Sequence, residues 1–414
     1  MTKVLADLCE AIVDCEHKTV PEGDGFALSV GTRAMKDGRL LIEACKPVSR
    51  STYEAWARRM KPQPGDLVLA REAPVGQVIR VPEDPRLCLG QRTVLIRPAY
   101  KRVHPRFLHY WLLGSEAQGV MTAKARGATV PHLNVEDIRA LDVRNLPDDG
   151  RVQEFGGETL GALDDLIENN RRRIELLEQM AQAIYREWFV RYRYPGHEDA
   201  AFVDSPLGPI PDGWEVRPLT ELAMLDRTGV QPQRSPDERF DHFSIPAFDD
   251  GQLPTVDAGS TIKSGKFLLT EASVLVSKLN PRIERTWLFE PEGHRRCVAS
   301  TEFLALIPQG GVSLEFLYLL ARSAPFRERL RELSGGTSTS HQRAKPDDFL
   351  RLIVVVPQES AVSRFTRVIA PMLGMGRRLR VENRSLAALR DLLLPKLVTG
   401  EIDVSHLDLD AIVA

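Results

Sequence analysis

Short loops rich in cationic and amide side chains are the part of this sequence best suited to chemical recognition. The segment 277–286 reads SKLNPRIERT and lies between two predicted strands. Arginine and asparagine can form paired hydrogen bonds with base edges, and lysine can neutralise a phosphate. The alternative is a charged loop that is simply solvated. The relevant positions in this segment are Lys278, Asn280, Arg282 and Arg285.

A second kind of loop occurs twice, as GATVPHL and as GGTSTSHQR. Small and hydroxyl residues allow the backbone to approach a phosphate, and histidine, glutamine and arginine can contact phosphates or bases. The alternative is an ordinary connection between a helix and a strand, with each histidine partly buried. The candidate residues in and beside these two loops are Lys124, Arg126, His132, Ser340, His341, Gln342, Arg343 and Lys345.

Catalytic motifs are absent from the sequence. It contains no NPPF- or NPPY-like tetrad, no GxGxxG after a strand, no Walker A motif, no HExxH and no GxSxG. The closest approach to the tetrad is LNPR at 279–282, which lacks the second proline and the aromatic residue. We therefore expect a chain that performs no chemistry itself and holds no cofactor.

Composition narrows the class of protein further. The 414 residues predict two to four domains, and a hydrophobic content of 43% is enough for packed cores. The net charge of −2 argues against a simple, uniformly basic nucleic-acid binder, unless the positive charge is local or partners supply it. Five scattered cysteines predict free thiols in a reducing cytoplasm, and we expect no metal site at Cys9, Cys15 and His17.

The chain repeats itself at an offset of 209 to 210 residues. His132 corresponds to His341, and Pro98, which ends the segment VLIRP, corresponds to Pro308. A period this long predicts two whole domains, not a solenoid of short repeats. Alignment of the two copies adds three weaker candidates, Arg71, Gln91 and Arg92, which are selected by position alone.

A long charged helix is predicted at the end of each copy, with apolar residues at alternating steps of three and four. One asparagine falls in each seam, where it would either penalise wrong registers or lie solvated at the edge. Pro371 and Pro395 predict kinks or local breaks in the second helix. Arg390 falls in phase with the second seam, and we expect its neighbour Leu389 to compensate. The main seam residues are Leu163, Ile167, Asn170, Ile174, Leu177 and Ile184 in the first helix and Leu379, Asn383, Leu386 and Leu393 in the second.

The sequence resembles the specificity subunit of type I restriction–modification enzymes along essentially its whole length. The segments that carry the resemblance are LEQMAQAIYREWFV, SPLGPIPDGWEVRPLTELA and LRDLLLPKLVTGEI, together with the duplicated layout. The resemblance implies an α+β protein with two mixed α/β target-recognition domains and two long helices that form an intramolecular antiparallel coiled coil with pseudo-twofold symmetry. The expected domains are 1–146, 147–195 (first helix), 196–357, 358–400 (second helix) and a tail at 401–414.

The resemblance also implies a function. Each recognition domain would read one half of a bipartite, asymmetric target in double-stranded DNA, and the helices would set the spacer and dock two methyltransferase subunits. Those partners would bind S-adenosylmethionine, and restriction subunits would complete the nuclease; no membrane is involved. Two alternatives stay open: a single-chain methyltransferase or nuclease whose site escapes detection, and a scaffold that binds protein.

Overall fold

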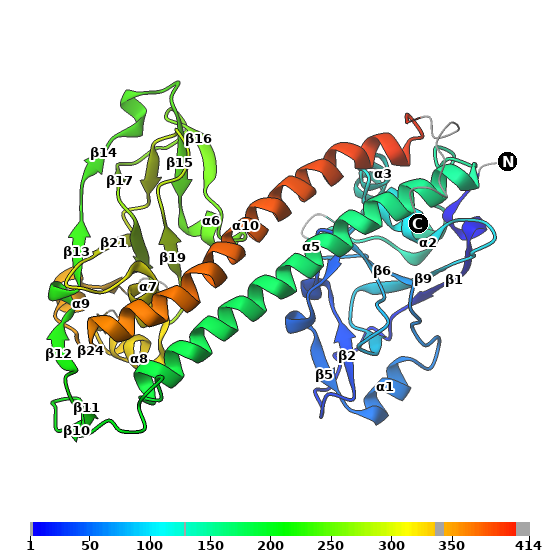
Figure 1. Ribbon diagram of the computed structural model, residues 1–414. Coiled ribbons are helices and arrows are strands. Elements are labelled where there is room, and N and C mark those ends of the chain that lie inside the picture. The colour runs from blue at the N-terminus through cyan, green and yellow to red at the C-terminus, as the bar shows by residue number, and fades with distance from the viewer. Residues whose placement is uncertain (1–2, 128–129, 336–342, 403–414) are drawn as a thin grey trace. The chain divides into compact units, whose positions relative to one another are not determined.

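The computed structural model describes residues 3–127, 130–335 and 343–402. The chain divides into two compact units. The first is built from two separate stretches of the sequence and the second from one continuous stretch. Unit 1 comprises Met1–Ile167 and Ser385–Ala414, and unit 2 comprises Glu168–Arg384. Each unit contains its own sheets, helices and hydrophobic core (Figure 1).

Unit 1 is built on an antiparallel four-stranded sheet in the order β1-β9-β6-β7. Short apolar runs bounded by Gly and Pro favour buried strands, and three such runs form β6, β7 and β9. A second sheet has the order β5-β2-β8, with β2 parallel to β8. The bounds are β1 Cys9–Asp14, β2 Ala27–Val30, β3 Met35–Lys36, β4 Arg39–Leu40, β5 Lys46–Val48, β6 Leu67–Ala70, β7 Val78–Arg80, β8 Leu87–Leu89 and β9 Thr93–Pro98.

In unit 1, α2 and α4 pack against the four-stranded sheet, whereas α1 contacts β8 of the second sheet. The helices α2 and α3 are separated at Gly114, which adopts an extended conformation between them. Asn134 occupies the N-cap of α4, but its side chain makes no capping hydrogen bond to the backbone. The helices are α1 Arg50–Trp56, α2 Pro105–Leu113, α3 Ser115–Lys124 and α4 Val135–Arg139.

Unit 2 repeats this architecture with a larger second sheet. Its antiparallel sheet has the order β13-β21-β18-β19, and its second sheet has the order β14-β17-β20-β15-β16. The segment 277–286 lies between two strands, β18 and β19, as predicted, and β21 pairs with β18 on its other side. The strands of these sheets are β13 Ala223–Asp226, β14 Gly229–Val230, β15 Arg239–Phe243, β16 Thr255–Ala258, β17 Lys266–Leu269, β18 Ser273–Ser277, β19 Thr286–Phe289, β20 Cys297–Ala299 and β21 Phe303–Pro308.

The described residues of unit 2 also form three two-stranded pairings and four shorter helices. In one of these pairings β12 is antiparallel to β24, the strand before α10. The remaining elements are β10 Phe202–Val203, β11 Ile210–Pro211, β12 Glu215–Pro218, α6 Ile245–Asp249, α7 Leu314–Arg322, α8 Ala324–Glu332, β22 Ser334–Gly335, β23 Arg343–Ala344, α9 Pro346–Leu350 and β24 Ile353–Val356.

The two units therefore share one topology. The order β1-β9-β6-β7 matches β13-β21-β18-β19. In unit 1 the helices α2 and α3 follow β9, and in unit 2 the helices α7 and α8 follow β21. The parallel pair of β2 with β8 matches the parallel pair of β15 with β20. Shared connectivity at this level shows that the sequence repeat is a repeat of fold.

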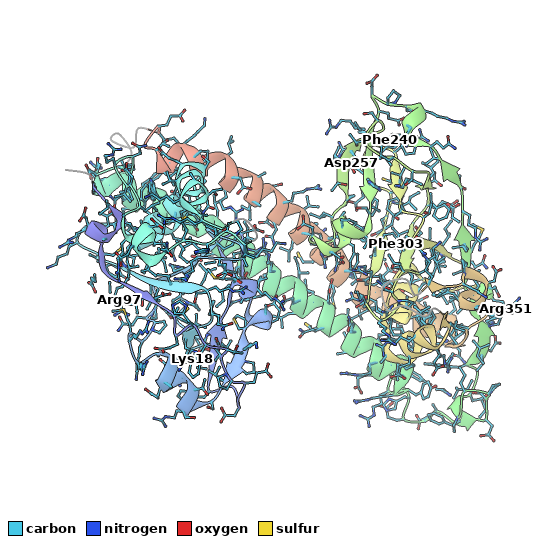
Figure 2. All side chains as sticks on the ribbon, turned by 180° about the vertical axis from the view of Figure 1, so that it is seen from behind. Lys18, Arg97, Phe240, Asp257, Phe303 and Arg351 are labelled. Carbon is cyan, nitrogen blue, oxygen red and sulfur yellow. The ribbon has the colours of Figure 1, made fainter. Side chains whose placement is uncertain are left out.

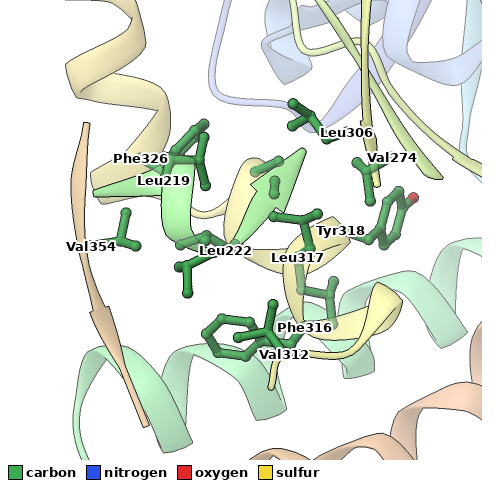
Figure 3. Close-up of a cluster of buried hydrophobic side chains, with 14 of the residues drawn as sticks. Leu219, Leu222, Val274, Leu306, Val312, Phe316, Leu317, Tyr318, Phe326 and Val354 are labelled. Atoms are coloured by element: carbon green, nitrogen blue, oxygen red, sulfur yellow. The ribbon is translucent and has the colours of Figure 1, made fainter. Parts of the chain in front are cut away.

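The core of unit 2 lies between its antiparallel sheet and α7 (Figure 3). Phe316 and Leu317 point from α7 into this cluster, and both are fully enclosed. The equivalent core of unit 1 contains Phe107 and Leu108 of α2 at the repeat-related positions. A separate cluster under the second sheet of unit 2 includes Phe303, while Phe240 packs on the other side of that sheet (Figure 2).

Polar contacts also fix the central sheet of unit 1. Arg97 on β9 (Figure 2) donates hydrogen bonds of 2.9 and 2.7 Å to the two carboxylate oxygens of Asp66, which is almost completely buried. This bidentate contact raises the pKa of the guanidinium. A buried carboxylate requires such a partner because desolvation of an unpaired charge is costly.

Two long helices contribute to both units. They are α5, Gly150–Tyr185, which continues as a π-helical turn to Val190, and α10, Glu359–Val398. In unit 1 the first part of α5 meets the last part of α10, where Asp164 accepts a hydrogen bond of 2.8 Å from Arg390. In unit 2 the last part of α5 and its π-helical turn meet the first part of α10. There the ring of Phe189 packs edge-on against that of Phe365, with 4.8 Å between the ring centroids. Within each unit the two segments are antiparallel.

The expected breaks at Pro371 and Pro395 are wrong, because α10 is continuous through both prolines. Each proline removes one backbone donor and frees one carbonyl in the preceding turn. Both prolines are exposed, so the freed carbonyl faces water, which can satisfy it. A proline on the solvent side of a packed helix is therefore tolerated here.

The expectation that Leu389 compensates for Arg390 is also wrong. Leu389 is 44% exposed, whereas Arg390 itself lies in the packed face with its guanidinium paired to Asp164. Tyr110 of α2 donates a hydrogen bond of 2.7 Å to the same carboxylate. The seam of unit 1 thus contains a partly buried polar network where the heptad pattern predicts an apolar contact.

Candidate nucleic-acid interface

The two candidate loops of unit 2 lie against each other. Leu279, in the loop after β18, forms an antiparallel bridge with Arg343. The amide of Ala344 donates a hydrogen bond of 3.1 Å to the carbonyl of Lys278. Residues about 65 positions apart in sequence are thereby fixed side by side at the end of a buried strand. The backbone pairing makes one surface from two predicted segments.

The same arrangement occurs in unit 1. The amide of Leu133 donates to the carbonyl of Arg71 at 2.8 Å, and the amide of Arg71 donates to the carbonyl of Arg92 at 2.9 Å. His132 bridges both Glu72 and Arg126. The loop after β6 therefore meets the 126–133 segment as the loop after β18 meets the 343–345 segment. The backbone of Arg71 thus contacts both Arg92 and Leu133.

Two candidate residues adopt the left-handed backbone conformation, which non-glycine residues rarely occupy. Arg92 has φ of 68° and Asn280 has φ of 47°. Such backbone geometry costs on the order of 1 kcal/mol and persists only where neighbouring contacts enforce it. Asn280 is half-buried, and its Oδ1 has no hydrogen-bond partner among the described residues. This amide therefore keeps a buried, unused acceptor within the loop after β18.

Most of the candidate arginines already have a carboxylate partner. The pairs and their N–O distances are Arg71–Asp14 at 3.2 Å, Arg92–Glu72 at 3.2 Å, Arg126–Asp137 at 3.9 Å and Arg343–Glu302 at 2.9 Å. Exposed ion pairs contribute only about 0–1 kcal/mol each. Exchange of the carboxylate for a phosphate therefore costs little at the exposed positions, which are Arg92, Arg126 and Arg343.

Arg285 stands apart from the other candidates. Its guanidinium donates two hydrogen bonds, of 2.7 and 2.8 Å, to the carboxylate of Asp249 at the end of α6. Its side chain is only 11% exposed. A contact with a base would require this bidentate pair to break. In the structure Arg285 therefore connects its loop to the end of α6. Arg71, which is 17% exposed and bonded to Asp14, is similarly occupied.

The remaining candidates are exposed or lie outside the described residues. Arg282, Lys345 and Gln91 are exposed, and Lys278, Lys124 and His132 are half-buried. Gln91 and Arg92 also line a hollow of about 300 Å³ in unit 1, together with Arg33 and Lys46. Ser340, His341 and Gln342 lie outside the described part of the chain.

One cluster in unit 1 has metal-binding residue types. Asp14, Cys15 and His17 hold their ligand atoms within 4.8 Å of one another. The carboxylate of Asp14, however, is already engaged, since His17 Nε2 lies 2.8 Å and Arg71 Nη1 3.2 Å from it. A guanidinium beside the ligands opposes a cation through charge repulsion. All five cysteines are free thiols, and burial raises the pKa of Cys9 to about 12.

Sequence inspection missed part of the positive charge in unit 2. Arg186 at the end of α5 and Arg331 on α8 line one groove together with Arg282. No local pattern marks these residues, because they come from three segments that only the tertiary structure brings together. The described part of the chain contains no helix long and apolar enough to cross a lipid bilayer.

The fold and the paired loops define a class: a duplicated protein in which each unit presents the same two cationic loops at the end of its central sheet. No family model matches the chain. The MjaIX type I restriction enzyme specificity subunit of Methanocaldococcus jannaschii is 23% identical over 355 residues, which cover 83% of this chain and 79% of that protein. The HindI type I specificity subunit of Haemophilus influenzae is 23% identical over 382 residues, with 76% and 81% covered.

The fold is shared with a solved structure. The crystal structure of a type I restriction–modification S subunit from M. genitalium aligns over 96% of both chains with a TM-score of 0.62 and 13% sequence identity. The sequence and fold comparisons agree over most of the chain. The predicted resemblance to specificity subunits of type I restriction–modification systems is therefore confirmed.

Proposed function

We propose that this chain is the non-catalytic DNA-recognition subunit of a type I restriction–modification system. Unit 1 and unit 2 each read one half of a bipartite target in double-stranded DNA. The observation that carries the proposal is the repeated loop pair: in both units the loop after β6 or β18 is fixed by backbone hydrogen bonds to a second polar loop. Loops held on a rigid scaffold are well suited to present side chains to base edges.

The two half-sites differ because the two loops differ. The loop after β6 reads AREAPVGQ, whereas the equivalent loop after β18 reads SKLNPRIE. Base readout depends on the donors and acceptors that each side chain offers, so unlike loops select unlike bases. The complete target is therefore asymmetric.

The long helices set the distance between the half-sites. Antiparallel packing of α5 with α10 is visible within each unit, and both helices contribute residues to both units. In the proposed assembly the helices form one intramolecular coiled coil that fixes the spacer and docks two methyltransferase subunits. Restriction subunits complete the nuclease.

Chemistry in this assembly belongs to the partners. A methyltransferase must flip its target adenine out of the duplex into a pocket beside its cofactor. The sequence has no adenine-methyltransferase tetrad, so the S-adenosylmethionine site is assigned to the partner subunits. The purified chain incubated with DNA and S-adenosylmethionine should give no methylation; turnover by the chain alone would favour a single-chain enzyme and overturn this assignment.

Exchange of one recognition domain tests the proposal directly. Residues 1–146 are replaced by the corresponding domain of a relative, and the methylated motif is mapped in DNA exposed to the reconstituted complex. One half of the motif should change and the other half should stay the same. Exchange of residues 196–357 is the matched control and should change only the opposite half. A change in both halves after either exchange contradicts independent readout.

A further inference from the structure

A groove in unit 2 concentrates positive charge from three separate segments. Its volume is about 550 Å³, and it is lined by the end of α5, the loop after β18 and the start of α8. Five arginines line the groove: Arg186, Arg282, Arg322, Arg327 and Arg331. Glu284 is the one carboxylate among the described lining residues. The described lining residues therefore carry more positive than negative charge.

The arginines differ in how far they are already satisfied. Arg322 pairs with Glu178 at 3.4 Å and with Glu284 at 3.1 Å, so its charge is compensated. Arg186 and Arg282 are exposed and form no ion pair within the described part of the chain. The charge of Arg322 is therefore balanced, and the uncompensated positive charge in the groove comes from Arg186 and Arg282.

Arg327 supplies the second observation. It is only 4% exposed, and its Nη2 donates a hydrogen bond of 2.6 Å to the carbonyl of Pro281. Its Nη1 is buried without a hydrogen-bond partner in the described residues. Burial lowers the pKa of Arg327, and the neighbouring Arg331 and Arg322 lower it further. A buried guanidinium nitrogen with no acceptor is costly, and Arg327 also lines the groove, so an anionic oxygen that enters the groove would compensate its charge.

The start of α8 adds a backbone contribution. Ser323, Ala324 and Pro325 line the groove, and Ser323 is the N-cap residue of this nine-residue helix. The Ser323 hydroxyl donates to the carbonyl of Leu320 at 2.7 Å and so does not cap the helix. An uncapped helix N-terminus carries a partial positive charge and free amides, which favour a phosphate oxygen.

We propose that this groove binds a phosphate group of the DNA backbone beside the half-site read by unit 2. The inference rests on the proposed function, because Arg282 and Pro281 belong to the same loop as the base-reading candidates Lys278 and Asn280. Backbone contacts fix the register of a protein on the duplex, while base contacts a few residues away select the sequence. The groove therefore positions the loop that unit 2 uses for readout.

The test compares salt dependence in the reconstituted complex. Binding to duplex DNA that contains the mapped motif is measured between 50 and 200 mM salt for wild type and for the double variant Arg186→Gln/Arg282→Gln. Each phosphate contact that is lost makes the slope of log K against log salt less steep by about 0.9. The double variant should lose roughly tenfold in affinity. Arg186→Gln alone, which leaves the loop after β18 intact, should lose part of that affinity on all sequences alike and keep the methylated motif unchanged.

The matched control removes the same charge elsewhere in unit 2. Arg351 and Arg367 are exposed and lie outside the groove. The Arg351→Gln/Arg367→Gln variant should keep the wild-type slope. A wild-type slope in the groove variant overturns the phosphate site, whereas failure of the wild-type complex to bind duplex DNA overturns the proposed function itself.

A free phosphate ion could bind the same groove in place of a phosphate group of DNA. Inorganic phosphate is added at constant ionic strength, with sulfate-free chloride buffer as reference. Competition with DNA that disappears in the groove variant supports the proposed site. Phosphate that protects the wild type against thermal unfolding without competing with DNA would assign the groove to a free anion and overturn the DNA contact.

Discussion

At the scale of single residues, His109 links stability to pH. It is enclosed in the core of unit 1, and its Nε2 lies 3.2 Å from the carbonyl of Val78. Burial lowers its pKa to about 4. Between pH 6.5 and 4 the unfolded chain binds a proton that the folded chain does not. Stability from this residue is therefore complete above pH 6.5, falls as the pH drops to about 4, and changes no further below that.

The expected loss over this window is at most roughly 3 kcal/mol. His109→Gln keeps an N–H donor but cannot titrate, so its free energy of unfolding should fall less between pH 7 and 4.5. Urea unfolding at four pH values measures both slopes. His294→Gln at an exposed position is the control and should keep the wild-type slope; equal slopes for wild type and His109→Gln would refute the assignment.

A glycine in α5 is required by close packing. A Cβ at Gly157 would lie 2.6 Å from His104 Nδ1 and 2.9 Å from the backbone nitrogen of Phe107. Gly157→Ala should therefore destabilise the protein by about 1–3 kcal/mol, although alanine is the better helix former. Gly374 in α10 has nothing within 4 Å of its Cβ position, so Gly374→Ala should stabilise by about 0.5–1 kcal/mol. Thermal unfolding compares the two, and the same sign for both would contradict the packing argument.

At the scale of elements, the two asparagines of the seams test the register of α5 against α10. Asn170 lies 19 residues before Phe189, and Asn383 lies 18 residues after Phe365, its ring partner. Antiparallel packing therefore brings the two asparagines level with each other within unit 2. Asn170 is only 2% exposed and Asn383 is half-buried, so the interpretation of Asn170 as a solvated edge residue is wrong.

A double-mutant cycle measures this coupling. Asn170→Leu and Asn383→Leu should each destabilise, because each leaves one amide facing an apolar side chain. The double variant should be more stable than the sum of the single effects predicts, by at least about 0.5 kcal/mol. Asn169 is exposed, so Asn169→Leu combined with Asn383→Leu should be additive. Additivity in both cycles would mean that the two asparagines are not in contact.

At the scale of the whole molecule, the proposed spacer depends on the length of both helices. Insertion of one heptad into α5 and one into α10, at the level of Asn170 and Asn383, preserves the seam and adds about 10 Å of helix. The DNA duplex rises about 3.4 Å per base pair, so the spacer in the methylated motif should change by roughly three base pairs. Both half-sites should stay unchanged.

The control for this experiment places the heptad in α5 alone. The mismatch would disturb packing against α10, and the yield of the assembled complex should fall. Methylation mapping reads the spacer, and gel filtration reads assembly. An unchanged spacer after the paired insertion would exclude the helices as the element that sets the distance.

The sequence alone determined the repeat, the central strands and the two helical seams. These features are periodic and local, so apolar runs such as those that form β9 and β21 identify themselves without knowledge of their neighbours. Steps of three and four identified Leu163 and Leu379 in the same way. The resemblance to specificity subunits followed from the same features, because it rests on the order of the landmarks.

The tertiary structure decided which residues meet and which charges remain available. The pairing of Leu279 with Arg343 and of Arg285 with Asp249 joins segments far apart in sequence. Whether a cation is exposed, paired or buried depends on groups brought near it only by folding. The groove that contains Arg186 and Arg327 is the clearest case, since no sequence pattern records a surface shared by three segments.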